Sequence, residues 1–141
     1  MDEGTGLSAE RIKHLELIQS VVARLANNSF LIKGWTLTVA AAFFALIANR
    51  QGWSTAVVGL VPLLVFWGLD AAFLRQERLF RRLYEDARTP DSPVEVLSMD
   101  VSRYRENVGW WHTVTSMTLL PFYGALAAVD LLLIAARLWV L

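Results

Sequence analysis

Three long stretches of predominantly apolar residues constrain this chain more than any other feature of its sequence. They cover residues 30–49, residues 54–74 and part of residues 110–138. A helix rises about 1.5 Å per residue and the hydrocarbon layer of a bilayer is about 30 Å thick, so a span needs roughly 20 apolar residues. We therefore expect an all-α membrane protein with three transmembrane helices running up, down and up. The third span should cover residues 117–137, after an interfacial segment.

Composition and charge exclude several classes of function. Hydrophobic residues make up 55% of the chain and charged residues only 18%, which is more apolar than a soluble domain of 141 residues needs. Thirteen Lys and Arg balance thirteen Asp and Glu, so there is no basic surplus with which to bind nucleic acid. Cysteine is absent, which excludes disulfides and thiolate catalysis. Gly-rich phosphate loops, paired metal carboxylates and nucleophile elbows are also missing, so we expect neither an enzyme nor a cofactor.

The positions of the cations predict the orientation in the membrane, because Lys and Arg near the ends of spans stay on the cytoplasmic side. The opposite side would hold only Arg50 and Arg137. The sequence thus favours a multi-pass protein of the inner (plasma) membrane, with a cytoplasmic N-terminus and an external C-terminus. The cations expected in the cytoplasm are Arg11, Lys13, Arg24, Lys33, Arg75, Arg78, Arg81, Arg82, Arg88, Arg103 and Arg105.

Helices are also expected in the cytoplasmic part of this single domain. Residues 8–29 form an amphipathic pattern that starts at Ser8, a typical N-cap, and residues 75–88 extend the second span. Ser92, Pro93 and Glu95 match a capping box and predict a further helix over residues 93–108. Together these helices would form a small cytoplasmic stalk. The apolar seam of the last one would consist of Val94, Leu97, Val101, Tyr104 and Val108.

Charged side chains inside predicted spans are functional candidates, since burying a charge in a bilayer costs several kcal/mol unless it is paired, hydrated or protonated. Asp70 is expected to pair with Lys33 across antiparallel neighbours, or with Arg75 reaching up from the interface. Asp130 has no polar neighbour one turn away in its own helix. It would face a lumen, or it would only fix the packing of the helices. A protease pair is disfavoured, because the two aspartates should lie roughly 13 Å apart in depth.

Other side chains suggest a pore lining or interface anchors. Thr115 and Thr118 precede Pro121, and they would either supply oxygens to a pore or compensate for the carbonyl that the proline frees. His14 and His112 lack the companions that a metal needs, so no metal site is expected. The expected interface anchors, which would contact lipid headgroups, are Trp35, Trp110, Trp111, Arg75, Arg78 and Arg82.

Two strings in the sequence resemble those of a group of small bacterial inner-membrane proteins to which no activity is assigned. They are NNSFLIKGWTLTVAAAFFAL (residues 27–46) and FWGLDAAFLRQERLFRRLYEDAR (residues 66–88). The resemblance spans about half of the chain and contains no catalytic motif. It implies a bacterial inner-membrane protein in which the first two helices and their cytoplasmic continuation are the distinctive parts.

These features lead to two hypotheses about function. Three helices enclose too little space for a solvent path, so conduction would require a homo-oligomer, and Gly124 and Ala128 have the small-xxx-small spacing of close helix contacts. The first hypothesis is an oligomeric pore-forming or membrane-perturbing effector, gated through its cytoplasmic helices. The second is a non-conducting adaptor or structural subunit that docks a soluble cytoplasmic partner at the bilayer.

Overall fold

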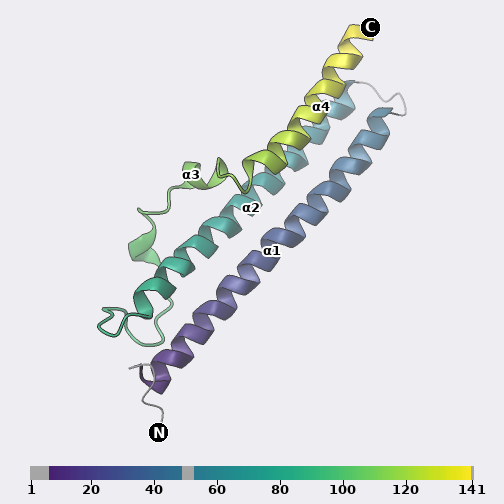
Figure 1. The fold of residues 1–141 in the computed structure, drawn as a ribbon. Coiled ribbons are helices and arrows are strands. Elements are labelled where there is room, and N and C mark those ends of the chain that lie inside the picture. The colour runs from purple at the N-terminus through teal and green to yellow at the C-terminus, as the bar shows by residue number, and fades with distance from the viewer. Residues whose placement is uncertain (1–6, 49–52, 141) are drawn as a thin grey trace.

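Two very long helices form an antiparallel hairpin that runs the length of the molecule (Figure 1). α1 (Ala9–Ala48) has 40 residues, which gives a length of about 60 Å, and α2 (Trp53–Ala87) has 35. In this computed structural model residues 7–48 and 53–140 are described, and within them the chain contains helices and no strand. The predicted connection between the first two spans, including Arg50, lies outside the described residues.

Each helix of the hairpin joins an apolar stretch to an amphipathic segment, and the predicted extension of the second span is confirmed as far as Ala87. The expected N-cap at Ser8 is confirmed, because its hydroxyl oxygen accepts a hydrogen bond from the Arg11 amide at 3.2 Å. From there α1 runs unbroken through the amphipathic segment and the first apolar stretch. α2 likewise continues past the second apolar stretch to Ala87, and it contains Pro62 without ending there.

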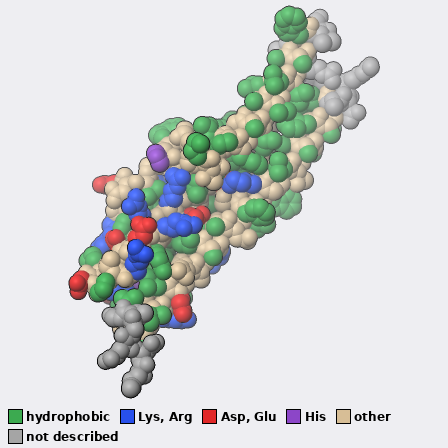
Figure 2. All heavy atoms as spheres, in the orientation of Figure 1, with side chains coloured by type: hydrophobic (Ala, Val, Ile, Leu, Met, Phe, Trp, Pro, Cys, Tyr) green, Lys and Arg blue, Asp and Glu red, His purple; other side chains and the backbone are tan. Residues whose placement is uncertain are grey.

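The apolar half of the hairpin has the length and surface of a membrane-spanning structure. α1 and α2 each contain a window of 18 residues that is apolar enough to cross a bilayer. Only 11% of that window in α1 and 17% in α2 is buried inside the chain, whereas the core helix of a soluble protein would bury most of it. Figure 2 shows hydrophobic side chains over this half, with Lys, Arg, Asp and Glu gathered at the other end.

A shorter helix, α4 (Leu120–Val140), packs along α2 and has few contacts with α1. It starts three residues after the expected position of the third span, because residues 115–119 form turns. The one-turn helix α3 (Trp110–Val114) precedes them. Pro121 therefore lies in the first turn of α4, where a proline removes no helical hydrogen bond. The carbonyl that Thr115 and Thr118 were expected to compensate for is not freed.

The prediction of a helix over residues 93–108 is wrong. This part of the chain belongs to a return segment (residues 88–109) of turns, with one short 3₁₀ helix, η1 (Ser102–Tyr104). The Ser92 hydroxyl accepts the amide of Val94 at 3.1 Å, a local turn that replaces the capping box. Leu97 has a φ of 68°, which is incompatible with a right-handed helix. Asp100 then binds the amide and hydroxyl of Ser102 at 2.8 and 2.9 Å and starts η1.

Three apolar residues of the predicted seam are nevertheless buried, whereas Leu97 is exposed. Val94, Tyr104 and Val108 pack against Ile18 of α1 and Leu83 of α2. We call this end of the molecule the head, and it comprises residues 9–28, 75–87 and 88–109. Because its core joins three distant parts of the sequence, the return segment is held in place without helical hydrogen bonds.

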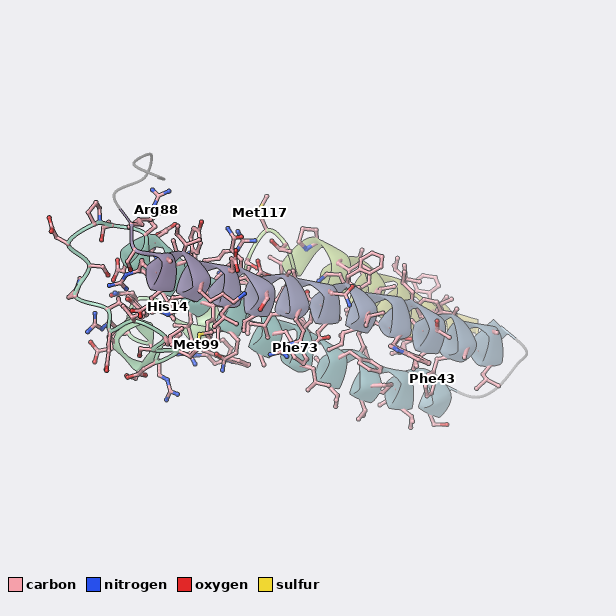
Figure 3. The ribbon with its side chains drawn as sticks, turned by 90° about the horizontal axis from the view of Figure 1, so that it is seen from below. His14, Phe43, Phe73, Arg88, Met99 and Met117 are labelled. Carbon is pink, nitrogen blue, oxygen red and sulfur yellow. The ribbon has the colours of Figure 1, made fainter. Side chains whose placement is uncertain are left out.

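Polar contacts reinforce the head. The Arg11 guanidinium donates to the Val94 carbonyl at 2.8 Å, and the ring Nε2 of His14 donates to the Ser98 carbonyl at 2.8 Å. Figure 3 shows His14 and Met99 at this same end of the hairpin. Tyr104 donates its hydroxyl to Asp86 at 2.7 Å. Burial and this hydrogen bond raise the pKa of Tyr104, so it remains a neutral donor.

Replacing Leu83 by alanine should loosen the return segment. Leu83 is buried in the head core, so we expect a loss of about 2–4 kcal/mol of stability and faster proteolysis between residues 88 and 109. Leu97→Ala is the control, because Leu97 is 56% exposed. Limited proteolysis of the nanodisc-embedded protein measures both variants. Equal cleavage rates for Leu83→Ala and the parent protein would contradict this description of the core.

Candidate functional site

A fully buried carboxylate joins the three long helices near the middle of the molecule. Asp70 of α2 has 0% exposure, and its Oδ2 lies 2.5 Å from the ammonium nitrogen of Lys33 on α1. The Tyr123 hydroxyl of α4 donates to the same oxygen at 3.0 Å. Ser29 of α1 donates to the other oxygen, Oδ1, and itself accepts from Lys33 at 2.9 Å. We call these four residues the Asp70 cluster.

The predicted ion pair between Asp70 and Lys33 is thus confirmed, and the alternative pair with Arg75 is wrong. Arg75 instead donates to the backbone carbonyls of Val108 at 2.9 Å and Arg105 at 3.3 Å. It therefore fastens the return segment to α2, a role that its position among the expected anchors did not suggest.

Sequence reasoning missed Ser29 and Tyr123 as members of the cluster. One available signal was that Ser29 lies one helical turn before Lys33, so the two side chains share a face. Tyr123 carries the first polar side chain after Pro121 in the third apolar stretch. What the sequence could not reveal was the rotation of α4, which turns that hydroxyl toward α2.

Aromatic packing fixes the Tyr123 side chain. Its ring stacks on Trp67 with an interplanar angle of 1° and a centroid separation of 5.8 Å, and Phe122 meets it edge-on at 5.0 Å. Trp67 in turn donates its indole N–H to the Val114 carbonyl at 3.1 Å. The hydroxyl of Tyr123 is consequently held toward Asp70 by a rigid aromatic support that also connects to α3.

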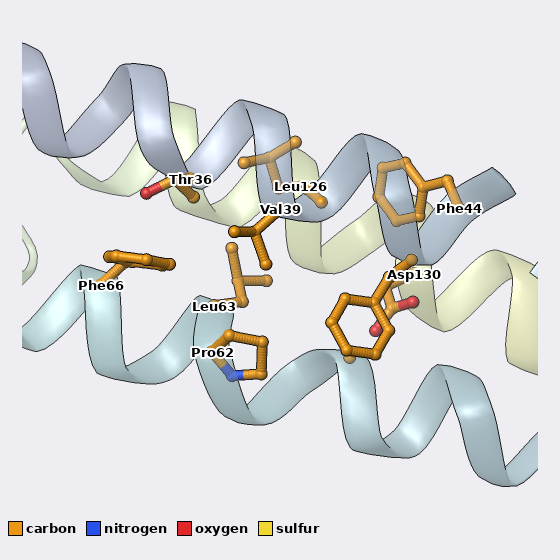
Figure 4. A pocket seen from close by; sticks show the side chains of 11 residues that line it. Thr36, Val39, Phe44, Pro62, Leu63, Phe66, Leu126 and Asp130 are labelled. Atoms are coloured by element: carbon orange, nitrogen blue, oxygen red, sulfur yellow. The ribbon is translucent and has the colours of Figure 1, made fainter. Parts of the chain in front are cut away.

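Asp130 presents the opposite case, a buried carboxyl group without a hydrogen-bond partner. Only 3% of the residue is exposed, and neither side-chain oxygen is hydrogen-bonded among the described residues. It borders a cavity of about 10 Å³, which has room for about one water molecule. The lining is apolar apart from Thr36, and it comes from α1, α2 and α4 (Figure 4). Thr36 already donates its hydroxyl to the Ile32 carbonyl at 2.8 Å.

Asp70 and Asp130 do not share a site. Asp70 is bound to Tyr123, and Asp130 lies seven residues further along α4, which places it about 10 Å away along the helix axis. Two carboxylates that share a proton must nearly touch. The two acids therefore form separate centres, one saturated with donors and one without any.

The expected pore hydroxyls lie in neither centre. Thr115 is exposed and donates back to the Trp111 carbonyl at 2.8 Å, and Thr118 is exposed in the turn before α4. Both lie between α3 and α4 rather than on a helix wall. Because Thr115 and Thr118 are exposed and Asp130 is buried inside the chain, the three side chains do not form one polar lining.

The tryptophans named as anchors are open to the surroundings. Trp35 is exposed on the apolar half of α1, and Trp110 and Trp111 are exposed at the start of α3. The arginines differ from one another: Arg75 is used internally, whereas Arg78 and Arg82 border a groove beside α3. His14 and His112 belong to different surroundings, and the described residues contain no group of three potential metal ligands.

The two buried acids should respond oppositely to the same substitution. Asp70→Asn leaves the Lys33 ammonium without its counter-charge, so we expect a loss of about 2–3 kcal/mol and a lower melting temperature. Asp130→Asn removes no hydrogen bond among the described residues and places no charge in the cavity. Stability should therefore be unchanged or higher. Tryptophan fluorescence during thermal unfolding in nanodiscs measures both variants.

A double variant separates the ion pair from the shape of the side chain. Lys33→Met combined with Asp70→Asn removes the unpaired ammonium and should recover part of the stability lost in Asp70→Asn. If Asp70→Asn alone is as stable as the parent protein, the Asp70 cluster does not hold the three helices together.

Comparison of the chain with models of protein families, with curated proteins and with solved structures gave no match.

Proposed function

We propose that this chain is a three-span protein of the bacterial inner membrane that acts as a non-conducting adaptor or structural subunit. In this proposal α4 is the third span, the head lies in the cytoplasm and the C-terminus lies outside. Ten of the thirteen Lys and Arg lie in the head, and this uneven distribution of cations between the two ends supports the orientation. The 21 residues of α4 are about the number that a bilayer requires.

The observation that carries this proposal is the inward orientation of the charged side chains. Asp70 and Asp130 are buried, and Lys33 is mostly covered where it contacts Asp70. The outward face of α4 presents apolar side chains such as Val129, Leu131 and Leu132. Several copies around a shared axis would line a lumen with such residues, and an apolar wall opposes the passage of ions.

The head has the properties of a docking platform. Its own core holds it together, and it continues into the apolar half through two unbroken helices. A groove of about 440 Å³ runs between α1 and α2, and its lining includes Val22, Ala26 and Tyr84. A soluble partner bound there would be positioned rigidly at the membrane surface.

A pore-forming effector is the second candidate, and the unpaired carboxyl group of Asp130 is what favours it. A carboxyl group beside a cavity of three helices is a place where an ion or proton path would start. Opening that path would require α4 to move away from α1, with which it has few contacts.

In both cases we propose that the chain forms a homo-oligomer through α4. A side chain built at Gly124 would meet open space, and Ala125 and Ala128 are exposed. Small residues on one helix face allow two helices to approach closely. Gly124→Leu should therefore reduce the mass of the complex, and Gly34→Leu is the matched control on α1.

The two candidates are separated by measuring oligomer mass and ion flux on the same preparation. For the adaptor we expect liposomes containing a defined oligomer to release no more ions than empty liposomes. Asp130→Asn should change neither flux nor mass. Ion flux through the parent oligomer that Asp130→Asn abolishes would overturn the adaptor and establish the pore.

Docking through the groove can be tested in cells. A photoreactive side chain at Ala23, which lines the groove, should form a crosslink to one soluble protein, whereas the same side chain at the exposed Asp91 should not. Crosslinks of equal yield from both positions would count against the groove as the docking surface.

A further inference from the structure

Three arginines of the head line one groove, and two of them, Arg78 and Arg82, form no ion pair with a carboxylate among the described residues. Arg78 and Arg82 lie one helical turn apart on α2. The groove that they line has a volume of about 390 Å³, and Asn107 and His112 close it on the other side. The return of the chain toward α3 thus adds a second wall beside arginines that the sequence predicted only as anchors at the lipid headgroups.

The neighbouring arginines do not compete for the same role. Arg81 pairs with Glu77 at 2.7 Å, and Arg75 is engaged with the carbonyls of the return segment. Arg78 reaches only a neutral group, the Thr113 hydroxyl at 3.5 Å. Glu85 is the one acidic residue among those described in the groove lining. The groove therefore carries uncompensated positive charge suited to an anion.

The position along α2 matches the headgroup layer of a bilayer. Arg78 lies four residues beyond the end of the second predicted span (residues 54–74), about 6 Å along the helix, and the headgroup layer extends roughly 5–7 Å beyond the hydrocarbon. Side chains of a helix lean toward its N-terminus, which for α2 is the direction of the apolar half. The guanidinium groups of Arg78 and Arg82 therefore extend back toward the membrane.

Exposed apolar side chains continue from the groove toward the apolar half. Trp111 is 77% exposed and Met117 is 89% exposed, and Met117 projects away from the hairpin in Figure 3. Trp111 directly precedes His112 and Met117 follows it on the way to α4, so both lie on the same stretch of chain as the groove wall. A ligand with an anionic group and long apolar chains fits this arrangement better than a free phosphate ion.

We propose that the groove between α2 and residues 107–112 binds the phosphate group of one anionic phospholipid. Arg78 and Arg82 are its cationic ligands, because a guanidinium offers paired N–H donors to phosphate oxygens. The acyl chains lie over Trp111 and Met117. A zwitterionic lipid is disfavoured, since it would bring its own cation next to two arginines. This binding site is independent of whether the protein is an adaptor or a pore.

Native mass spectrometry of the protein extracted from vesicles of equal phosphatidylglycerol and phosphatidylcholine content tests this site. We expect one phosphatidylglycerol to remain bound in preference to phosphatidylcholine. The variant Arg78→Gln/Arg82→Gln should lower its retention at least roughly fivefold, because two charge-assisted contacts are lost. The control Arg24→Gln/Arg88→Gln removes the same charge from exposed positions outside the groove and should retain the lipid.

Three outcomes would overturn the proposal. Equal losses in both double variants would mean that the protein attracts lipid by its overall charge only. Equal retention of the two lipids would exclude recognition of an anionic headgroup. Displacement of the bound lipid by millimolar inorganic phosphate would assign the groove to a free anion instead. A melting temperature close to that of the parent protein shows that the groove variant remains folded.

Discussion

The Asp70 cluster is the interaction on which the arrangement of the three long helices depends. A carboxylate with no exposed surface is unfavourable in an apolar environment unless donors surround it, and here they come from both neighbouring helices. Lys33 supplies the counter-charge, and Tyr123 contributes a neutral hydrogen bond. Apolar packing alone would allow the helices to rotate or slide against each other. The cluster selects one register, since a shift of a single residue would separate Asp70 from its partners.

Much of this arrangement could be predicted from the sequence, and the reasons are physical. The lengths of the apolar stretches determine where the long helices lie, and the pairing of Lys33 with Asp70 follows from their similar depth on antiparallel helices. The return segment could not be predicted in the same way. The capping box at Ser92 competes with local turns that Ser and Asp side chains stabilise. Val94 and Tyr104 can be buried in either conformation, so their burial does not select the helix. The apolar spacing of three and four residues therefore predicted the burial of Val94, Tyr104 and Val108 correctly, but Leu97 is exposed and the helix does not form.

Asp130 illustrates a different limit of sequence reasoning. Its lack of a polar neighbour on its own helix was visible in the sequence, but the direction of its side chain depends on the rotation of α4 about its axis. That rotation is set by Tyr123, two turns earlier, which must face Asp70. Since both residues lie on the same face of α4, the orientation of Tyr123 turns Asp130 into the chain's interior. The acid thereby faces a small internal cavity rather than the outer surface of the chain.

The order of the helices along the chain has a consequence for biogenesis. Lys33 and Asp70 both belong to the hairpin that leaves the ribosome first, so their opposite charges can neutralise each other before α4 has been synthesised. The hairpin can then enter a bilayer with the charges of Lys33 and Asp70 compensated by each other. Tyr123 arrives later and finds a preformed acceptor at Asp70. In the proposed three-span arrangement α4 would insert against this hairpin, so its position would be guided by helices that were synthesised before it.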